Sequence, residues 1–480
     1  MKCVVLIRPT SENLSYLSRE LASPRFGSYF IFFTNKVKRA DLKSLAEKDE
    51  NEVVNDVKEI PSDFLVFESH VFTAKVPSPS TNLRWNKKAE ALNRCIDSLK
   101  AILHSTKSTR ANICYVKDSS LCEELAHGLK DEVNHEGVRD TTLVLIDRRI
   151  DPVTPLLNQW TYQAMIHELI GLKNNTVDLE GRDDIPPEVK KMTLSAESDE
   201  FYRLNMYANF GEIGQTIQNL VKSFQDKVKG QQKSLDSIND IKDFITSYPE
   251  FKKMSGTVSK HVALVGELSK EVKSHGLLDV SELEQNIACG SEKDANLNQL
   301  SQLLNSPNLR TKDALRLISL FAIRYESDMD RHLERFCKSV KGASRKEVYE
   351  VIQMVQKFSR VKSRFLFDDK STPFAPSNFF KGLKGAENVY TQHQPLITKE
   401  ILPDIIRGKQ RSDFNYLRQA EPTAKVIVFV IGGLTYEETR AVSMFNKDNG
   451  SNVVIGGTSI LNYDDFMHLV HESTSNSPDL

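Results

Sequence analysis

The sequence predicts a mixed α/β protein in which one parallel α/β domain is split by a large helical insertion. Residues 142–146 (TLVLI) form a short apolar run that ends in turn residues, which is typical of a strand buried on both faces of a sheet. A second strand–helix–strand pattern occurs at residues 425–470, near the C-terminus. Residues 171–370, which lie between these regions, carry apolar side chains mostly at helical spacing.

The first 70 residues predict a separate, small α/β unit. The expected elements are strands at 3–7, 29–33 and 64–67 and helices at 11–21 and 41–57. A β-α-β-α-β order of this kind builds a small parallel sheet. The unit is shorter than most domains and opens directly on a strand, so we expect it to lack its N-terminal part.

Residues 71–170 and 371–480 predict the two parts of the split α/β domain. The first part is expected to contain a linker at Pro77–Ser80, helices at 88–103, 119–132 and 158–170, and strands at 113–116 and 142–146. The second part is expected to contain strands at 425–431 and 452–455 and helices at 436–446 and 464–470.

Within the insertion, two apolar stripes predict an αα-hairpin at about residues 203–272. The members of the first stripe are Met206, Phe210, Ile213, Ile217, Leu220 and Phe224, and those of the second are Leu235, Ile238, Ile241, Ile245, Tyr248, Met254, Val258, Val262, Val265, Leu268 and Val272. The stripes either pack on each other or offer an apolar groove to partner helices. Pro249 interrupts the second stripe, and a proline inside a helix costs about 3 kcal/mol unless a bend is wanted, so Pro249 is a candidate hinge.

Composition excludes several classes of function. The 64 Lys and Arg residues nearly balance 65 Asp and Glu residues, so net charge provides no argument for nucleic-acid binding. No apolar run approaches the length of about 18 residues that a membrane span needs. Six cysteines without CxxC spacing predict reduced thiols and not a disulfide framework or a zinc site.

Signals for catalysis are weak, and we predict no cofactor or metal. Gly432-Gly433 and Gly456-Gly457 follow predicted strands and could serve a nucleotide-dependent α/β enzyme, but tight turns at strand ends explain them more simply. Asp147 and Asp151 flank the end of the strand at 142–146, where α/β enzymes place catalytic groups. The simpler interpretation is that these carboxylates cap the turn and pair with the neighbouring arginines.

Four stretches resemble the SM (Sec/Munc-18) family of SNARE-binding proteins, and most closely its vacuolar protein sorting branch. They are residues 155–171 (PLLNQWTYQAMIHELIG), 254–269 (MSGTVSKHVALVGELS), 381–395 (KGLKGAENVYTQHQP) and 428–438 (VFVIGGLTYEE). Together with the segments between them, these stretches extend the resemblance over essentially the whole chain.

The resemblance implies a three-domain arch: a truncated α/β domain 1 (1–70), the split α/β domain 2 (71–170 and 371–480) and an inserted helical domain 3 (171–370). It also implies a non-enzymatic protein that binds a syntaxin-type Qa-SNARE and promotes SNARE assembly. Such a protein acts in traffic between the trans-Golgi network and endosomes. It is cytoplasmic and is held at Golgi and endosomal membranes by its SNARE partner, without binding nucleic acid.

Two binding surfaces follow from the resemblance. The helix expected at 41–59 would form a groove for the N-terminal peptide of a syntaxin, with Leu42 and Val54 as its apolar floor and Glu59 as its polar edge. The alternative is that Leu42 and Val54 pack internally. The hairpin would bind SNARE helices through Phe210, Ile213, Ile217, Leu220, Ile241, Ile245 and Pro249, with bending at Pro249 controlling that binding.

The chain departs from the family at its N-terminus, because other members carry further α/β units before the point where this sequence begins. Their absence is expected to leave an exposed sheet edge and to weaken SNARE binding. A truncated form with impaired SNARE binding is therefore an alternative to a fully active binding protein.

Overall fold

The computed structural model describes residues 1–74, 76, 88–133, 140–182, 185–230, 249–290, 292–364, 366–367 and 392–475. The linker expected at Pro77–Ser80 and most of the stretch 381–395 lie outside these described residues.

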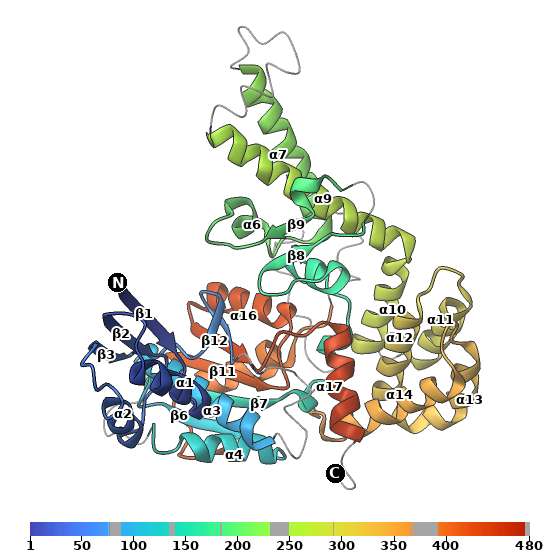
Figure 1. Ribbon diagram of the computed structural model, residues 1–480. Coiled ribbons are helices and arrows are strands. Elements are labelled where there is room, and N and C mark those ends of the chain that lie inside the picture. The colour runs from blue at the N-terminus through green and yellow to red at the C-terminus, as the bar shows by residue number, and fades with distance from the viewer. Residues whose placement is uncertain are drawn as a thin grey trace.

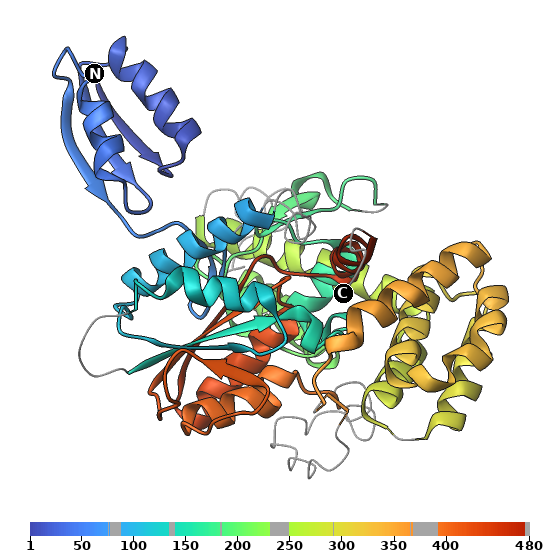
Figure 2. The same cartoon turned by 90° about the horizontal axis from the view of Figure 1, so that it is seen from below.

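The N-terminal residues form a compact α/β unit at one corner of the molecule (Figure 2). Its elements are β1 (Lys2–Ile7), α1 (Ser11–Ala22), β2 (Ser28–Phe33), α2 (Arg39–Ala46) and β3 (Val54–Glu59). The three strands are parallel in the order β1-β2-β3, and Tyr29, Ile31 and Phe33 of β2 are buried with Leu21. β1 is an edge strand of this sheet, and its Val4 side chain is 70% exposed.

The third strand of this unit lies elsewhere than predicted. The helix expected at 41–57 ends at Ala46, and β3 takes the place assigned to residues 64–67. The Asp49 carboxylate accepts hydrogen bonds from the backbone N–H groups of Val53 (2.9 Å) and Val54 (3.0 Å), which competes with helical hydrogen bonding. The valines of this segment also favour an extended backbone.

A seven-stranded sheet forms the centre of the molecule, in the order β10-β6-β7-β11-β12-β5-β4 (Figure 1). Its strands are β4 (Leu65–Glu68), β5 (Val71–Thr73), β6 (Asn112–Val116), β7 (Thr141–Asp147), β10 (Phe414–Tyr416), β11 (Lys425–Ile431) and β12 (Asn452–Gly457). β11 pairs in parallel with β7 on one side and β12 on the other, so the C-terminal strands lie inside a sheet begun far earlier in the chain. All seven residues of β7 are buried, which confirms the expected central strand.

Helices cover both faces of this sheet. α3 (Lys88–Ser105) and α4 (Ser120–Leu129) lie on one face, and α16 (Tyr436–Asn449) lies on the other (Figure 1). Polar bridges connect the N-terminal unit to α3 and its surroundings. Asp63 pairs with both Arg8 and Arg94 at 2.9 Å, and the Asn35 side chain donates to the backbone carbonyl of Asp97 (2.7 Å).

The segment between β7 and β10 is mainly helical. Its elements include β8 (Thr176–Asp178), β9 (Lys191–Thr193), α5 (Tyr162–Met165), α6 (Glu200–Asn205), α7 (Phe210–Gly230), α9 (Pro249–Ser274), α10 (Leu277–Cys289), α11 (Lys293–Asn305), α12 (Thr311–Arg324), α13 (Met329–Ser339), α14 (Arg345–Phe358) and α15 (Leu402–Ile406). α7 and α9 pack on each other and project from the body, whereas α10 to α14 form a bundle at the opposite side from the N-terminal unit (Figure 1).

The C-terminal helix α17 (Tyr463–Ser475) packs on this bundle and not on the central sheet alone. Phe466, Leu469 and Val470 are fully buried in the same apolar cluster as Phe321 of α12 and other bundle residues. The end of the chain therefore ties the α/β domain to the helical region.

A buried ion pair joins the two parts of the split domain. Arg148, directly after β7, donates from Nη1 to both carboxylate oxygens of Glu438 at 2.8 Å, and both side chains are at most 1% exposed. Glu438 also accepts a hydrogen bond from the Thr435 backbone N–H (2.8 Å) and so caps α16. As the sequence indicated, Asp147 pairs with Arg149 (2.7 Å), and Asp151 caps the following turn through the N–H of Thr154 (3.0 Å).

The glycine turns pack closely against neighbouring side chains. Gly432 and Gly433 have φ values of +94° and +97°, which other residues rarely adopt. A Cβ atom on Gly432 would lie 2.8 Å from the Cβ of Arg148, and one on Gly433 would lie 2.7 Å from the Cγ of Leu461. Gly456 is similarly close to the ring of Phe72. These glycines are thus needed for the backbone turn and for close internal packing.

We expect Arg148→Met to lower the free energy of unfolding by about 3–5 kcal/mol, because it leaves the buried Glu438 carboxylate unpaired. Urea denaturation measures the loss. Adding Glu438→Gln should restore part of it, and Arg39→Met at an exposed position should have little effect. A cost below about 1 kcal/mol for Arg148→Met would contradict the importance of the pair.

Candidate functional site

The residues predicted to form the N-terminal groove are spread over two elements. Leu42 lies in the first turn of α2 and Val54 begins β3, and both are partly buried against the core of the N-terminal unit. Glu59 lies at the other end of β3, about 16 Å from Val54 at the usual rise per strand residue. Leu42 and Val54 therefore contribute to internal packing, and the three residues do not line one helix as predicted.

Glu59 has a local structural contact. Its Oε1 accepts a hydrogen bond from the backbone N–H of Val37 (2.8 Å), just before α2. The residue is otherwise exposed, so the carboxylate positions the start of α2 while remaining accessible at the surface. Of the three predicted residues, Leu42 lies in the first turn of α2 and Glu59 contacts the backbone just before that helix, whereas Val54 lies at the start of β3.

The α7 stripe faces inward. Ile213 is fully buried and Ile217 is 8% exposed, in a cluster that also contains Leu264 and Leu268 of α9. Phe210 and Leu220 are partly buried against that cluster. The hairpin thus packs internally along this stripe in the structure, and its binding of partner helices stays a prediction.

The α9 face differs in detail from the sequence prediction. Val262 was assigned to the inner stripe, but it is 42% exposed, whereas His261 is fully buried beside it. The reason is polar pairing, because His261 finds hydrogen-bond partners inside, which hydropathy alone does not register.

Ile241 and Ile245 lie outside the described residues. Pro249 is the first residue of α9, a position that tolerates the missing N–H, and its hinge role stays a prediction.

A buried polar cluster fixes the base of the hairpin. The two ring nitrogens of His261 contact the Asp199 carboxylate (Nε2, 3.0 Å) and the Tyr162 hydroxyl (Nδ1, 2.8 Å). Lys260 forms an ion pair with the same carboxylate, and Asp199 also accepts from the N–H of Tyr202 (2.9 Å) to cap α6. The cluster connects α9 to α6 and to the start of α5.

The electrostatics of this cluster favour a neutral histidine and an ionised aspartate. Burial lowers the pKa of His261, and this effect outweighs the opposing influence of Asp199. Burial alone would raise the pKa of Asp199, but hydrogen bonds from His261, Lys260 and Tyr202 hold it well below its usual value. Neutral His261 then donates from Nε2 to Asp199 and accepts from Tyr162. One sequence signal could have revealed this site. His261 lies three residues after Val258 and three before Leu264, so helical spacing places it on the same face as these apolar residues.

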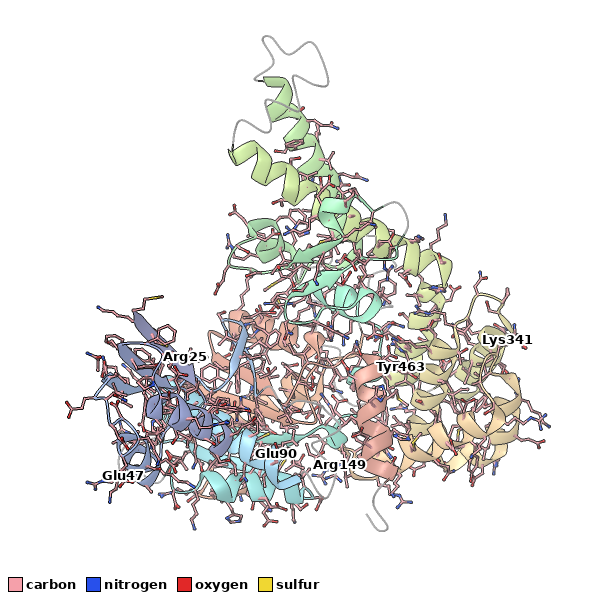
Figure 3. The ribbon with its side chains drawn as sticks, in the orientation of Figure 1. Arg25, Glu47, Glu90, Arg149, Lys341 and Tyr463 are labelled. Carbon is pink, nitrogen blue, oxygen red and sulfur yellow. The ribbon has the colours of Figure 1, made fainter. Side chains whose placement is uncertain are left out.

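Two further contacts hold the hairpin and bundle against the α/β body. Glu68 of β4 accepts from the Gln163 side chain (2.8 Å) and from the Tyr207 hydroxyl just before α7. On the other side, Glu168 pairs with Arg316 of α12 and accepts from the backbone N–H of Tyr463 (2.9 Å). Tyr463 lies at the start of α17 (Figure 3). The Arg316 guanidinium lies 4.6 Å from the centre of its ring.

Neither a metal site nor a membrane helix is found among the described residues. No group of three His, Cys, Asp or Glu side chains in the described ranges is placed to hold a metal ion. Within the same part of the chain, every helix is too short or too polar to cross a membrane.

A central sheet shared by distant segments, with a projecting helical pair, is the architecture expected of an SM protein, and the sequence comparison agrees. Residues 1–469 match the model of the Sec1 family. The chain belongs to the Sec1 family, whose members are non-enzymatic regulators of SNARE proteins.

Particular relatives define the branch. The chain is 40% identical over 486 residues to vacuolar protein sorting-associated protein 45 of Homo sapiens, covering 98% of this chain and 85% of that protein. It is 35% identical over 510 residues to the Saccharomyces cerevisiae protein of that name, covering 98% of this chain and 87% of that protein. The resemblance to the SM family and its vacuolar protein sorting branch is thereby confirmed.

Solved structures support the same conclusion. The SM protein Vps45 in complex with the Qa SNARE Tlg2 has a TM-score of 0.86 and 36% identity, covering all of this chain and 88% of that one. The Unc18–syntaxin 1 complex from Monosiga brevicollis has a TM-score of 0.74 at 19% identity, covering 98% of this chain and 88% of that one. This likeness shows that the fold is shared.

We expect stability to fall as the pH drops below about 6.5, the ordinary pKa of histidine. Burial lowers the pKa of His167, His261 and His393, so these side chains bind protons in the unfolded chain before they do so in the folded chain. His261→Gln retains a donor and an acceptor and should flatten the dependence between pH 6.5 and 5 by up to about 1.4 kcal/mol per pH unit.

Urea denaturation at a series of pH values measures this effect. Its control is His127→Gln, because His127 is exposed and pairs only loosely with Glu123 at 4.0 Å. An unchanged slope in His261→Gln, or an equal change in His127→Gln, would be inconsistent with the assigned role of His261.

Proposed function

We propose that this chain binds a syntaxin-type Qa-SNARE and promotes assembly of SNARE complexes during vesicle docking and fusion, in traffic between the trans-Golgi network and endosomes. The observation that carries the proposal is its likeness, along the whole chain, to a Vps45 structure solved with the Qa SNARE Tlg2. The protein would act as a cytoplasmic, peripheral component of Golgi and endosomal membranes, held there by its SNARE partner.

The first proposed contact is between the N-terminal unit and the N-terminal peptide of the SNARE. Leu42 is partly buried at the start of α2, and Glu59 has an exposed carboxylate that is tied to the same region through Val37. This pairing of an apolar and an acidic side chain supports a small peptide site at the beginning of α2. Val54, at the far end of β3, would contribute through the shared core and not through direct contact.

The second proposed contact is between the hairpin and SNARE helices. The α7 stripe (Phe210, Ile213, Ile217 and Leu220) already packs against α9, so partner helices would need the outer face or a separation of the pair. The contact between His261 and Asp199 holds α9 against α6 at the base of the hairpin. With this contact intact, the outer parts of the two hairpin helices would be able to separate while their base stays packed. Ile241, Ile245 and Pro249 belong to this proposal from sequence alone.

The domain limits inferred from the sequence are retained in this proposal, with one change. Domain 1 (1–70), domain 2 (71–170 and 371–480) and domain 3 (171–370) would act as the peptide site, the scaffold and the helical template. β4 pairs with β5 of the large sheet, so the functional limit of domain 1 would lie before Leu65.

We expect the purified chain to bind the cytosolic part of a trans-Golgi syntaxin, and removal of the syntaxin N-terminal peptide to weaken binding. Leu42→Arg should weaken peptide binding by more than the roughly 1 kcal/mol typical of a surface substitution, since it places a charge in the proposed apolar site. Isothermal titration calorimetry gives both values.

Leu278→Arg is the matched control, because Leu278 is 42% exposed on α10, outside both proposed surfaces. Thermal unfolding of both variants separates loss of binding from loss of fold. Equal affinity of Leu42→Arg and the unaltered chain would remove the proposed peptide site. Absence of any binding by a folded chain would contradict the proposed function.

For the hairpin, we expect Leu220→Arg to reduce binding to the helical region of the SNARE about tenfold or more, because it places a charge on the apolar stripe. Gln218→Arg, on the exposed side of the same helix, should change affinity little. Fluorescence anisotropy with a labelled SNARE fragment lacking the N-terminal peptide measures both. Similar losses in the two variants would argue against the stripe as a binding surface.

A further inference from the structure

The sheet of the N-terminal unit has one edge with which no other described strand pairs. β1 bonds to β2 on one side only. Residues 3–7 of β1 are all apolar, and the side chains of Val4 and Leu6 are 70% and 62% exposed. An exposed apolar strand edge of this kind is a template for pairing with another strand. This edge is separate from the candidate peptide site, because β2 and β3 lie between β1 and Glu59.

The opposite edge of the same sheet is protected against such pairing, whereas β1 is not. β3 carries the charged residues Asp56, Lys58 and Glu59, and a register shift interrupts its pairing with β2. Charges and bulges are devices by which edge strands avoid pairing with other chains. β1 pairs with β2 without interruption over six residues and contains no proline. Its one charged residue, Lys2, directs its ammonium over the ring of Phe30 (5.9 Å), away from the free edge.

The backbone groups at the free edge belong to alternate residues of β1. The carbonyl oxygens of Met1 and Ile7 accept hydrogen bonds at 3.2 and 2.9 Å from the residues that flank β2, so the odd-numbered residues bond toward β2. In a parallel ladder, the residues between them direct their N–H and C=O groups to the other side. Lys2, Val4 and Leu6 therefore present backbone donors and acceptors at the free edge.

This spacing is self-complementary. If a second copy of β1 runs antiparallel with Val4 opposite Val4, then Lys2 lies opposite Leu6, and each outward N–H meets an outward C=O. In this register the two strands overlap along their whole length. A shift by one residue would place outward backbone groups opposite inward ones and would exchange the two faces of the sheet.

The helix-covered side of the edge is apolar as well. A hollow of about 460 Å³ lies between β1 and α1, and its lining includes Val5, Ile7, Tyr16 and Phe26. Tyr16 is 57% exposed in the single chain. Antiparallel pairing of two β1 strands would bring the two hollows together above the joined strands, so that their apolar linings would cover each other.

The charges of α1 match in the same arrangement. Its first turn carries Glu12 and its last turn carries Arg19, and among the described residues neither side chain forms an ion pair. Glu20 and Arg25 neutralise each other at 2.8 Å, so residues 11–25 contain two acids and two bases in all. A two-fold axis that makes the β1 strands antiparallel also makes the α1 helices antiparallel. Glu12 of each copy then lies toward the Arg19 end of the other copy.

We propose that the free edge of β1 binds a second copy of this chain, in an antiparallel β1–β1 pair that joins two N-terminal sheets into one. The N-terminal unit stands at a corner of the molecule, where a second unit can lie beside it (Figure 2). The pair uses the β1 edge of both copies, so assembly stops at the dimer. This self-association goes beyond the proposed SNARE binding and does not depend on it.

Sedimentation velocity of the full chain over a range of concentrations, without any SNARE, tests the proposal. We expect the mass to rise from 54.5 kDa to twice that value, with a dissociation constant in the micromolar range. The variant Val4→Lys, Leu6→Lys should raise the dissociation constant about tenfold or more, because it places like charges opposite each other across the pair. Both side chains are mostly exposed in the single chain, so its thermal unfolding should change little.

The matched control is Val57→Lys, Val66→Lys, which adds the same charge at positions 44% and 63% exposed on β3 and β4. It should dimerise like the unaltered chain. A monomeric mass at every concentration, equal weakening by the two double variants, or growth into assemblies larger than dimers would overturn the proposal.

Cysteine cross-linking tests the register. In the proposed pair, Val4→Cys places two thiols on opposed residues whose Cα atoms are about 5.5 Å apart, which suits a disulfide. We expect this variant to form a covalent dimer under mild oxidation, as seen on a non-reducing gel. Leu6→Cys lies opposite Lys2, and the native Cys3 lies opposite Val5, so neither Leu6→Cys nor the unaltered chain should cross-link to a similar extent. Failure of Val4→Cys to cross-link, or equal cross-linking of all three chains, would contradict the β1–β1 pair.

Discussion

The buried pair between Arg148 and Glu438 is the interaction on which the rest of the structure depends. It joins the end of β7 to the start of α16, two elements separated by the whole helical insertion. Because both charges are shielded from water, removing either one leaves the other buried without its main charged partner. Gly432 is required beside Arg148, since any side chain there would collide with it. The pair therefore determines how the two parts of the split domain meet.

A second set of buried polar contacts transmits this order to the helical region. Glu168, at the end of the helix that follows the β7 turn, binds Arg316 of the bundle and the backbone of Tyr463 at the start of α17. The contact between Asp199 and His261 connects α6 to α9 at the base of the hairpin. Polar contacts of this kind specify a single geometry, because buried donors and acceptors must be satisfied, whereas apolar packing accepts many alternatives.

This division fits a protein whose chemistry is recognition. The central sheet and its ion pairs form a stable support, and the candidate binding surfaces lie on the projecting hairpin and on the small N-terminal unit. The glycine turns that resemble nucleotide-binding loops are filled by Arg148, Leu461 and Phe72, so their sequence signal reflects internal packing.

The sequence by itself determined the central strands, the split of the α/β domain and the two helices of the hairpin's base, because continuous apolar runs and helical spacing are local properties of the chain. Family membership was also readable from four stretches. Only the tertiary structure decided that residues 54–59 form a strand and that β4 joins the large sheet, since strand pairing depends on distant partners. It also decided that His261 is buried and Val262 exposed, and that Ile213 and Ile217 pack inside. Those outcomes depend on which polar groups find partners in the fold, and the hydropathy of the chain does not register such partners.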